Sequence, residues 1–414
     1  MGIKQRLILL NFLQFFVWGS WLISLGGYMI VTLKFTGGQV GSIYATMGIA
    51  SLFMPALLGI VADRWINAER VLGMCHIAGS VMLFWASTVS DPHMLYWIML
   101  LNAMAYMPTL ALNNTVSYIV LEEKGFKVVK DFPRIRVWGT VGFICSMWLI
   151  DLCGWTVSPF QLIFSSAMSM FLGLYALTMP KCPPSKVKKE ASLLSSFGLD
   201  ALVLFKRRRM IVFFIFAMLL GAALQITNTF GEPFLHDFKN LFPGSFAVKH
   251  PGLLMSVSQI SETLFILTIP FFLYRFGIKK VMLMSIFAWV FRFGLFAVGN
   301  PGSGFILLFL SMIIYGMAFD FFNISGSLFV EKEAEINIRA SAQGLFMLMT
   351  NGFGAFLGGV ASGWVVDYFT IGGVKNWHNI WLTFAAYALL LGIVFPFVFK
   401  YKHDPEKVEI IHHS

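Results

Sequence analysis

Long apolar stretches recur along almost the whole of this chain, and they restrict its possible folds more than any other feature. Twelve stretches reach about 20 or more predominantly apolar residues, the length that an α-helix needs to cross a bilayer. They cover approximately residues 7–33, 38–62, 71–90, 93–121, 134–155, 158–180, 210–235, 248–274, 279–299, 303–330, 338–367 and 376–400. The sequence therefore predicts an all-α membrane protein with twelve transmembrane helices.

The composition excludes the other broad classes of protein. Of the 414 residues, 58% are hydrophobic and 12% are charged, whereas roughly 25% are charged in a soluble protein. Such a chain has too little polar surface for a soluble enzyme or nucleic-acid-binding domain, and too much apolar surface to be disordered. The first stretch follows Lys4 and Arg6 but is too long for a signal peptide, so we interpret it as a membrane span.

Positive charge is unevenly distributed between the connections of these stretches. With a cytoplasmic N-terminus, one side of the membrane holds most of the 30 Lys and Arg residues, and the other side holds only Lys34, Lys239, Lys249 and Lys375. Cytoplasmic loops of membrane proteins carry an excess of Lys and Arg. We therefore expect both termini in the cytoplasm, and the net charge of +10 requires no nucleic-acid partner.

The longest connection, residues 181–209, divides the chain into two sets of six stretches. It is basic at both ends and carries Leu194, Phe197 and Phe205 at helical spacing, which is typical of an amphipathic helix on the membrane surface. We expect an N-terminal six-helix bundle (1–180), this cytoplasmic linker (181–209), a C-terminal six-helix bundle (210–400) and a cytoplasmic tail (401–414).

The two sets of stretches also show a weak internal repeat. At a constant offset of 209 residues, Tyr106, Asn114 and Glu122 align with Tyr315, Asn323 and Glu331. The consistent order of such pairs supports two parallel, pseudo-symmetric six-helix repeats. Repeats of this kind are typical of transporters that bind their substrate between the two halves.

Polar side chains inside the stretches are candidate binding residues, because a polar group in hydrocarbon costs free energy unless it faces the interior of the bundle. In four stretches they recur at helical spacing. These residues are Arg136, Thr140 and Phe143; Gln225, Asn228 and Thr229; Ser256, Gln259 and Glu262; and Tyr315, Phe319 and Asp320. Amides that donate and accept, aromatic faces for stacking and a few charges suit a neutral polar ligand, such as a nucleoside or a sugar.

Several of these residues also have a structural interpretation. Gln225 and Gln259 can form interhelical hydrogen bonds. Arg136 can extend to the lipid headgroups from the cytoplasmic end of its helix. Arg292, inside the ninth stretch, can neutralise Asp320.

The remaining polar, glycine and cysteine residues give no sign of a second site. Glu232 lies near the outer end of its helix, where we expect water to solvate it. Two Gly-xxx-Gly patterns, formed by Gly354, Gly358, Gly359 and Gly363, indicate close helix packing. The cysteines are Cys75, Cys145, Cys153 and Cys182, and their spacing is not that of metal ligands, so we expect no metal and no cofactor.

Several motifs together give the chain a family resemblance. The segment Gly59–Trp65, which contains Asp63 and Arg64, resembles part of the gating-loop motif of the major facilitator superfamily. More specifically, and nearly end to end, the chain resembles the bacterial nucleoside permeases of the nucleoside:proton symporter family. The stretches that carry this resemblance are Phe12–Trp21 (FLQFFVWGSW), Phe53–Asp63 (FMPALLGIVAD), Ala105–Thr109 (AYMPT), Ile135–Phe143 (IRVWGTVGF), Leu224–Asn228 (LQITN), Ser258–Pro270 (SQISETLFILTIP) and Ala318–Gly326 (AFDFFNISG).

The resemblance implies a major facilitator fold and proton-driven uptake of nucleosides across a bacterial inner membrane, by a monomer in contact with membrane lipids. It implies a substrate site between the two bundles. The residues at the matching positions are Arg136, Thr140, Phe143, Gln225, Asn228, Gln259, Glu262, Tyr315, Phe319 and Asp320.

Coupling to protons requires a group that gains and loses a proton during transport. Nucleosides are neutral, so the membrane potential cannot concentrate them, whereas each charge that moves with a proton contributes about 2.3 kcal/mol per 100 mV. Asp320 and Glu262 are the acidic residues near the middle of a stretch, and burial disfavours the charged form of a carboxylate. We assign the proton to Asp320, with Glu262 as the alternative.

Two other functions compete with this interpretation. A sugar or oligosaccharide symporter of the same superfamily would also use amides, carboxylates and aromatic walls. A membrane sensor or an intramembrane enzyme would need an output domain or a catalytic constellation. His76 stands alone near a helix end in the sequence, so we expect a transporter and no enzyme.

Overall fold

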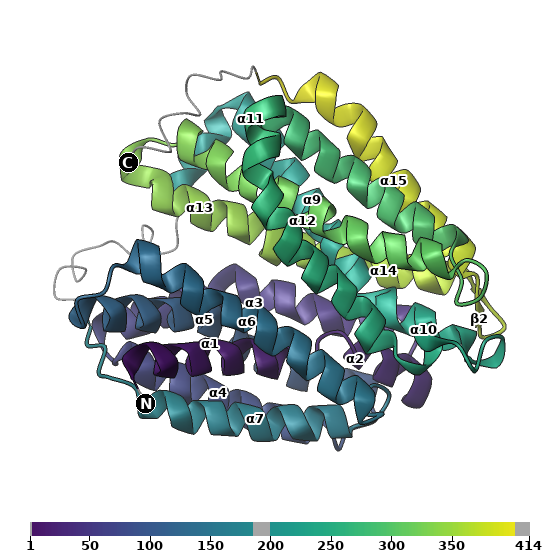
Figure 1. Cartoon of the computed structure of the whole chain (residues 1–414), viewed down its shortest axis with the longest axis horizontal. Coiled ribbons are helices and arrows are strands. Elements are labelled where there is room, and N and C mark those ends of the chain that lie inside the picture. The colour runs from purple at the N-terminus through teal and green to yellow at the C-terminus, as the bar shows by residue number, and fades with distance from the viewer. Residues whose placement is uncertain (1, 185–198, 402–414) are drawn as a thin grey trace.

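Helices make up most of the protein in the computed structural model, which describes residues 2–184 and 199–401. Figure 1 shows two groups of helices, one from each half of the chain. We call the end of the molecule at which α1 begins and α15 ends the terminal end, and the opposite end the far end.

The N-terminal group, shown in purple and blue in Figure 1, contains seven α-helical segments and one π-helix. These are α1 (Ile3–Gly19), α2 (Leu25–Gly27), the π-helix η1 (Tyr28–Thr32), α3 (Gly37–Arg64), α4 (Ala68–Ala86), α5 (Pro92–Glu123), α6 (Val128–Leu152) and α7 (Phe160–Leu177).

The C-terminal group, shown in teal, green and yellow, follows the undescribed residues 185–198 and so includes the end of the predicted linker. It contains the 3-10 helix η3 (Leu199–Lys206), α9 (Arg208–His236), the 3-10 helix η4 (Asp237–Asn240), α10 (Phe246–Lys249), α11 (Pro251–Val298), α12 (Phe305–Glu333), the 3-10 helix η5 (Ile336–Ile338), α13 (Arg339–Met347), the π-helix η6 (Leu348–Gly354), α14 (Ala355–Tyr368) and α15 (Trp377–Val398). A two-stranded hairpin, β1 (Thr370–Ile371) and β2 (Val374–Lys375), joins α14 to α15.

The apolar helices agree with an all-α membrane protein. In the described part of the chain, nine helical segments are long and apolar enough to cross a membrane. One of them, α11, contains both the eighth and the ninth predicted stretches, and α1 and α4 are outside the nine. The two stretches in α11 meet at Gly277, whose φ of 76° interrupts the helix and suits glycine because it has no Cβ.

We expected the first predicted stretch to form a single helix. In the structure this stretch is broken between α1 and α2. The break lies inside the protein, where side chains can satisfy the backbone groups that a broken helix leaves unpaired. The Ser20 hydroxyl donates to the carbonyl of Val17, and the Tyr44 hydroxyl accepts from the Gly26 N–H (3.0 Å) and donates to the carbonyl of Leu22 (2.6 Å). Hydrophobicity alone could not reveal a break that a neighbouring helix stabilises.

Helices α3 and α14 hold the two groups together along an interface of glycines. A methyl group on Gly359 would lie 2.7 Å from the carbonyl oxygen of Gly41, and one on Gly363 would lie 2.5 Å from that of Gly37. The other face of α14 packs on α9, where a methyl group on Gly358 would lie 2.5 Å from the carbonyl oxygen of Ala222. The predicted role of the Gly-xxx-Gly patterns in close packing is therefore confirmed.

The middle of the linker and the tail fall outside the described residues, at 185–198 and 402–414, so most of the predicted amphipathic helix lies there. Within the described part of the linker, η3 buries Ala201 and Leu204. The division into two bundles, linker and tail remains a prediction.

Candidate functional site

The far end of the molecule is closed by polar contacts between the two groups. The buried carboxylate of Asp151 in α6 accepts hydrogen bonds from Nδ1 of His250 (2.9 Å) and from the N–H of Gly252 (2.8 Å). Beside it, Nε1 of Trp148 donates to the hydroxyl of Ser256 (2.8 Å). Asp367 at the end of α14 accepts from the N–H groups of Gly37 and Gly38.

Several predicted binding residues in the middle parts of helices from both groups are only half-buried. They are Arg136, Thr140, Asn228, Gln259, Glu262 and Phe319.

Arg136 on α6 points into the protein. Its guanidinium carbon lies 4.0 Å from the centre of the Phe15 ring on α1, and its charge interacts with that of Glu262 on α11. An arginine that extended to the lipid headgroups would not face a carboxylate of the opposite group. The structure therefore favours the inward orientation.

Tyr315 on α12 connects the predicted residues of the C-terminal group. Its hydroxyl interacts with the side chain of Gln259, and Glu262 lies within electrostatic range of it. Its ring stacks on that of Phe319, with centroids 6.2 Å apart and an interplanar angle of 12°. Gln259, Glu262, Tyr315 and Phe319 thus form one cluster, in which Glu262 interacts electrostatically with Arg136.

Asp320 is buried beside this cluster. One of its carboxylate oxygens, Oδ2, has no hydrogen-bond partner, and its charge interacts with that of Glu262. Arg292 does not pair with it: Nη1 of Arg292 donates to the carbonyl of Ser311 (2.8 Å) and to the hydroxyl of Ser258 (3.3 Å). The structural alternative for Asp320, an ion pair with Arg292, is therefore wrong.

Two of the predicted binding residues, Gln225 and Asn228, lie on α9. Gln225 is buried, and its Nε2 donates to the hydroxyl of Thr229 one turn later (3.2 Å). This bond lies within one helix, so Gln225 does not serve there as an interhelical tie. Asn228, three residues further along the same helix, is half-buried.

Aromatic residues of α1 and α5 complete the site, and our sequence analysis missed them. Trp18 packs edge-on against Phe143 (centroids 6.2 Å apart) and lies 5.6 Å from the Tyr106 ring, while Phe15 contacts Arg136. Phe15 and Trp18 are one helical turn apart in the segment Phe12–Trp21. Their spacing was a signal, but it cannot be distinguished from ordinary apolar packing without knowing which face of α1 points inward.

Two predictions about other polar residues are wrong. Glu232 is not solvated: its side chain is fully buried and its Oε1 lies 3.3 Å from Nε2 of His236. His76 is not isolated near a helix end but lies within α4, with Nε2 2.8 Å from Oε1 of Gln14 and Nδ1 3.4 Å from the hydroxyl of Ser169. The Ser169 hydroxyl donates to the backbone carbonyl of His76, so this contact ties α4 to α7.

The residues of the predicted gating-loop motif lie away from the polar cluster. Asp63 and Arg64 form the last turn of α3 at the terminal end. The polar cluster instead lies between the two groups of helices.

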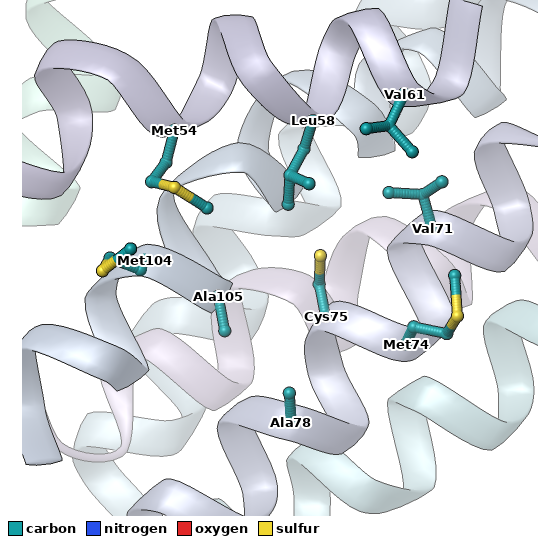
Figure 2. A pocket seen from close by; sticks show the side chains of 9 residues that line it. All are labelled: Met54, Leu58, Val61, Val71, Met74, Cys75, Ala78, Met104 and Ala105. Atoms are coloured by element: carbon teal, nitrogen blue, oxygen red, sulfur yellow. The ribbon is translucent and has the colours of Figure 1, made fainter. Parts of the chain in front are cut away.

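An apolar cavity of about 320 Å³ lies among α3, α4 and α5 (Figure 2). Figure 2 shows Met54 and Leu58 of α3 facing Cys75 of α4 and Met104 of α5. Its walls offer no amide or carboxylate, so it does not suit a nucleoside or a sugar.

Comparison with known proteins agrees with the geometry. A family described as "Nucleoside H+ symporter" matches residues 1–404. The chain is 58% identical to the xanthosine permease of Escherichia coli (strain K12) over 412 residues, 99% of both chains. It is 55% identical to the nucleoside permease NupG of the same organism over 406 residues, 97% of both chains. A crystal structure of nucleoside transporter NupG superposes with a TM-score of 0.92 and 55% identity, covering 97% of this chain and all of the other.

Proposed function

We propose a binding site and a transport route for this chain, which belongs to the nucleoside H⁺ symporter family and carries nucleosides across a membrane together with protons. The chain is a transporter and not an enzyme. Its nucleoside binds between the two groups of helices, among the side chains that face one another there.

The interaction between Arg136 and Glu262 is the observation that most supports this location. These oppositely charged side chains come from opposite groups, are half-buried and interact electrostatically. Two opposite charges that do not form a direct ion pair are well suited to hydrogen-bond the hydroxyl and amide groups of a ligand. Gln259 and Asn228 add groups that both donate and accept on the C-terminal side.

The aromatic side chains supply the second part of recognition. Phe143, Phe319 and Tyr315 lie among the polar groups, and the half-buried ring of Phe319 is available for stacking, whereas Tyr315 stacks on Phe319 and contacts Arg292. A nucleobase is flat and can stack on such rings, which gains free energy beyond the burial of its area. Arg136, Thr140, Phe143, Gln225, Asn228, Gln259, Glu262, Tyr315 and Phe319 are thus the proposed substrate-binding residues.

Asp320 is the proposed carrier of the proton. A charged carboxylate buried with an oxygen that lacks a hydrogen-bond partner is costly, and the nearby charge of Glu262 increases that cost. A proton on Asp320 removes both penalties. Glu262 is half-buried and interacts electrostatically with Arg136, which suits it to substrate hydrogen bonding; it is the alternative proton carrier.

Alternating access follows from the closed far end. We place both termini in the cytoplasm of a bacterial cell, as the distribution of Lys and Arg suggests. The structure then corresponds to a state closed to the outside and accessible from the inside. Release of the contacts at Asp151 and Asp367 would let the two bundles rock about the central site, and the turn at Asp63 and Arg64 would act at the inner gate.

The outer surface of the protein is suited to contact with membrane lipids. Large apolar side chains on the outer faces of the helices are exposed, among them Leu267, Trp364 and Phe397. Membrane lipids would cover them, and an acyl chain fits the chemistry of the cavity in Figure 2. We propose that the transporter works as a monomer, because each chain supplies both halves of the site.

Uptake by cells tests the function as a whole. Cells that lack their own nucleoside permeases should accumulate radiolabelled uridine, adenosine or xanthosine when they express this chain, and a protonophore should abolish the accumulation. Unlabelled nucleosides should compete, and sugars should not. Competition by a sugar but not by any nucleoside would replace this function with the sugar symporter.

Binding to purified protein tests the site. Gln225→Ala and Gln259→Ala should each weaken nucleoside binding in calorimetry, since each leaves ligand polar groups unpaired at a cost of roughly 1–3 kcal/mol. Gln161→Ala is a matched control, because this buried glutamine bonds Ser24 and backbone carbonyls away from the site. Normal affinity in both site variants would assign these glutamines to helix packing.

A further inference from the structure

Arg292 on α11 is fully buried and has no carboxylate partner among the described residues. Its Nη1 donates to two neutral acceptors, the carbonyl of Ser311 and the hydroxyl of Ser258, and its Nε has no hydrogen-bond partner. Two aromatic rings lie against its guanidinium: that of Tyr315, with its centre 4.5 Å from Cζ, and that of Phe296, at 5.1 Å.

A buried charge of this kind is an unfavourable way to stabilise a fold. Removal of a cation from water costs several kcal/mol, and neutral acceptors and ring faces return only part of that. Replacement of buried ionic groups by apolar side chains of similar volume is often neutral or stabilising. The presence of a buried, unpaired Arg292 is therefore better explained by what its charge does to its neighbours.

Those neighbours stand directly behind the proposed binding site. Ser258 precedes Gln259 in the chain, and Ser311 lies one helical turn before Tyr315 on α12. The Ser311 hydroxyl also donates to the carbonyl of Arg292 (2.9 Å). Arg292 thus fixes the second half of α11 against the two helical segments that present Gln259 and Tyr315.

The ring of Tyr315 is the direct link. A cation over an aromatic face is attracted by the electrons of the ring, so Arg292 holds the ring in one orientation. It also withdraws electron density from the phenol, which makes the hydroxyl a stronger hydrogen-bond donor. That hydroxyl is the group that interacts with Gln259 and lies near Glu262.

We propose that Arg292 is a positioning residue for nucleoside recognition, which orients the Tyr315 ring and strengthens its hydroxyl as a donor without itself touching the nucleoside. This inference rests on the proposed binding role of Tyr315 and Gln259. It assigns a function to a charge that neither Asp320 nor any other described carboxylate neutralises.

Calorimetry of the full-length protein in detergent, with uridine, adenosine and xanthosine, tests the inference. Arg292→Met should weaken binding about tenfold or more, as expected for loss of a desolvated cation–π contact, while the melting temperature stays equal or rises. Arg292→Lys keeps the charge and should recover part of the affinity. Phe296→Leu is the matched control: it removes the other ring against the guanidinium, so it should lower the melting temperature but leave affinity unchanged.

A double-mutant cycle separates positioning from a general structural effect. Tyr315→Phe should weaken binding, and adding Arg292→Met to it should cost less than Arg292→Met costs alone, because both changes act through the same hydroxyl. Fully additive losses, or normal affinity in Arg292→Met, would overturn the inference. If Arg292→Met does not fold, the comparison of Arg292→Lys with and without Tyr315→Phe decides by the same criterion.

The outcomes also distinguish this inference from the proposed site. Normal binding by both Tyr315→Phe and Gln259→Ala would show that the site itself is wrong. Weakened binding by those two variants together with normal binding by Arg292→Met would leave the site in place and remove only the positioning role.

Discussion

Replacement of Asp151 should open the far end of the transporter. Its carboxylate accepts from His250 and from the N–H of Gly252, and both donors belong to the opposite group of helices. Hydrogen bonds to a charged group contribute about 1.5–3 kcal/mol each. Asp151→Ala therefore removes about 3 kcal/mol or more from the closed state, which corresponds to a change of at least about a hundredfold in the ratio of closed to open molecules.

Electron–electron distance measurements on spin-labelled protein can detect this shift. Cys153 is exposed at the end of α6, and Leu241, also exposed, follows η4 in the other group. Labels on Cys153 and on Leu241→Cys, with the other three cysteines replaced by serine, should move apart in Asp151→Ala. Asp151→Asn keeps an acceptor for Gly252 and should give an intermediate shift.

A second aspartate, Asp131, provides a control for the distance measurement on Asp151→Ala. Asp131 pairs with Lys4 (2.8 Å) at the terminal end, and both residues belong to the N-terminal group. Asp131→Asn should leave the far-end distance unchanged. An unchanged distance distribution in Asp151→Ala, or an equal shift in Asp131→Asn, would show that Asp151 does not hold the far end closed.

Two further predictions concern the central interface and the site. Arg136→Lys should impair nucleoside uptake at equal expression. A compact ammonium cannot reproduce the planar guanidinium that lies on Phe15 and interacts with Glu262. Uptake at the wild-type rate would show that Arg136 is not part of the site. Gly359→Ala should destabilise the closed far end by about 1–3 kcal/mol, since its methyl group would crowd the carbonyl of Gly41; an unchanged distance between the labels at the far end would contradict this.

The positions of the helices were largely predictable from the sequence because each span leaves a long apolar signal. The exceptions are informative. The break after α1 depends on hydrogen bonds with Tyr44 and on close contact with α9, both of which come from distant segments. The π-helix η6 interrupts the eleventh span at Leu348–Gly354, where Thr350, Asn351 and two glycines stand among apolar residues but no proline marks a boundary.

The sequence could select candidate residues for the site but could not predict their contacts. Helical spacing selected Gln259, Glu262 and Tyr315 because each lies on a polar or aromatic stripe. Spacing could not show that Arg292 approaches Tyr315 rather than Asp320, since that depends on how the two halves of α11 pack on α12. Glu232 was misjudged for a related reason: closeness to a helix end does not imply exposure when another helix covers that end.

The assignment of the proton to Asp320 leads to a prediction about coupling. Because Arg292 bonds Ser258 and Ser311 instead of Asp320, Asp320→Asn breaks no ion pair and should leave the fold intact. The amide mimics the protonated carboxyl group, so the variant should still bind nucleoside and exchange it across the membrane.

What Asp320→Asn should lose is the response to a pH gradient. In proteoliposomes, counterflow exchange of labelled nucleoside requires only the loaded carrier and should survive at least in part, whereas accumulation driven by an imposed pH gradient should stop. Glu262→Gln should instead damage both modes, because Glu262 faces Arg136 and its loss weakens substrate binding. If Asp320→Asn still accumulates nucleoside in response to the gradient, the proton is carried elsewhere. Glu262, whose charge interacts with that of Asp320, then becomes the candidate for the carrier.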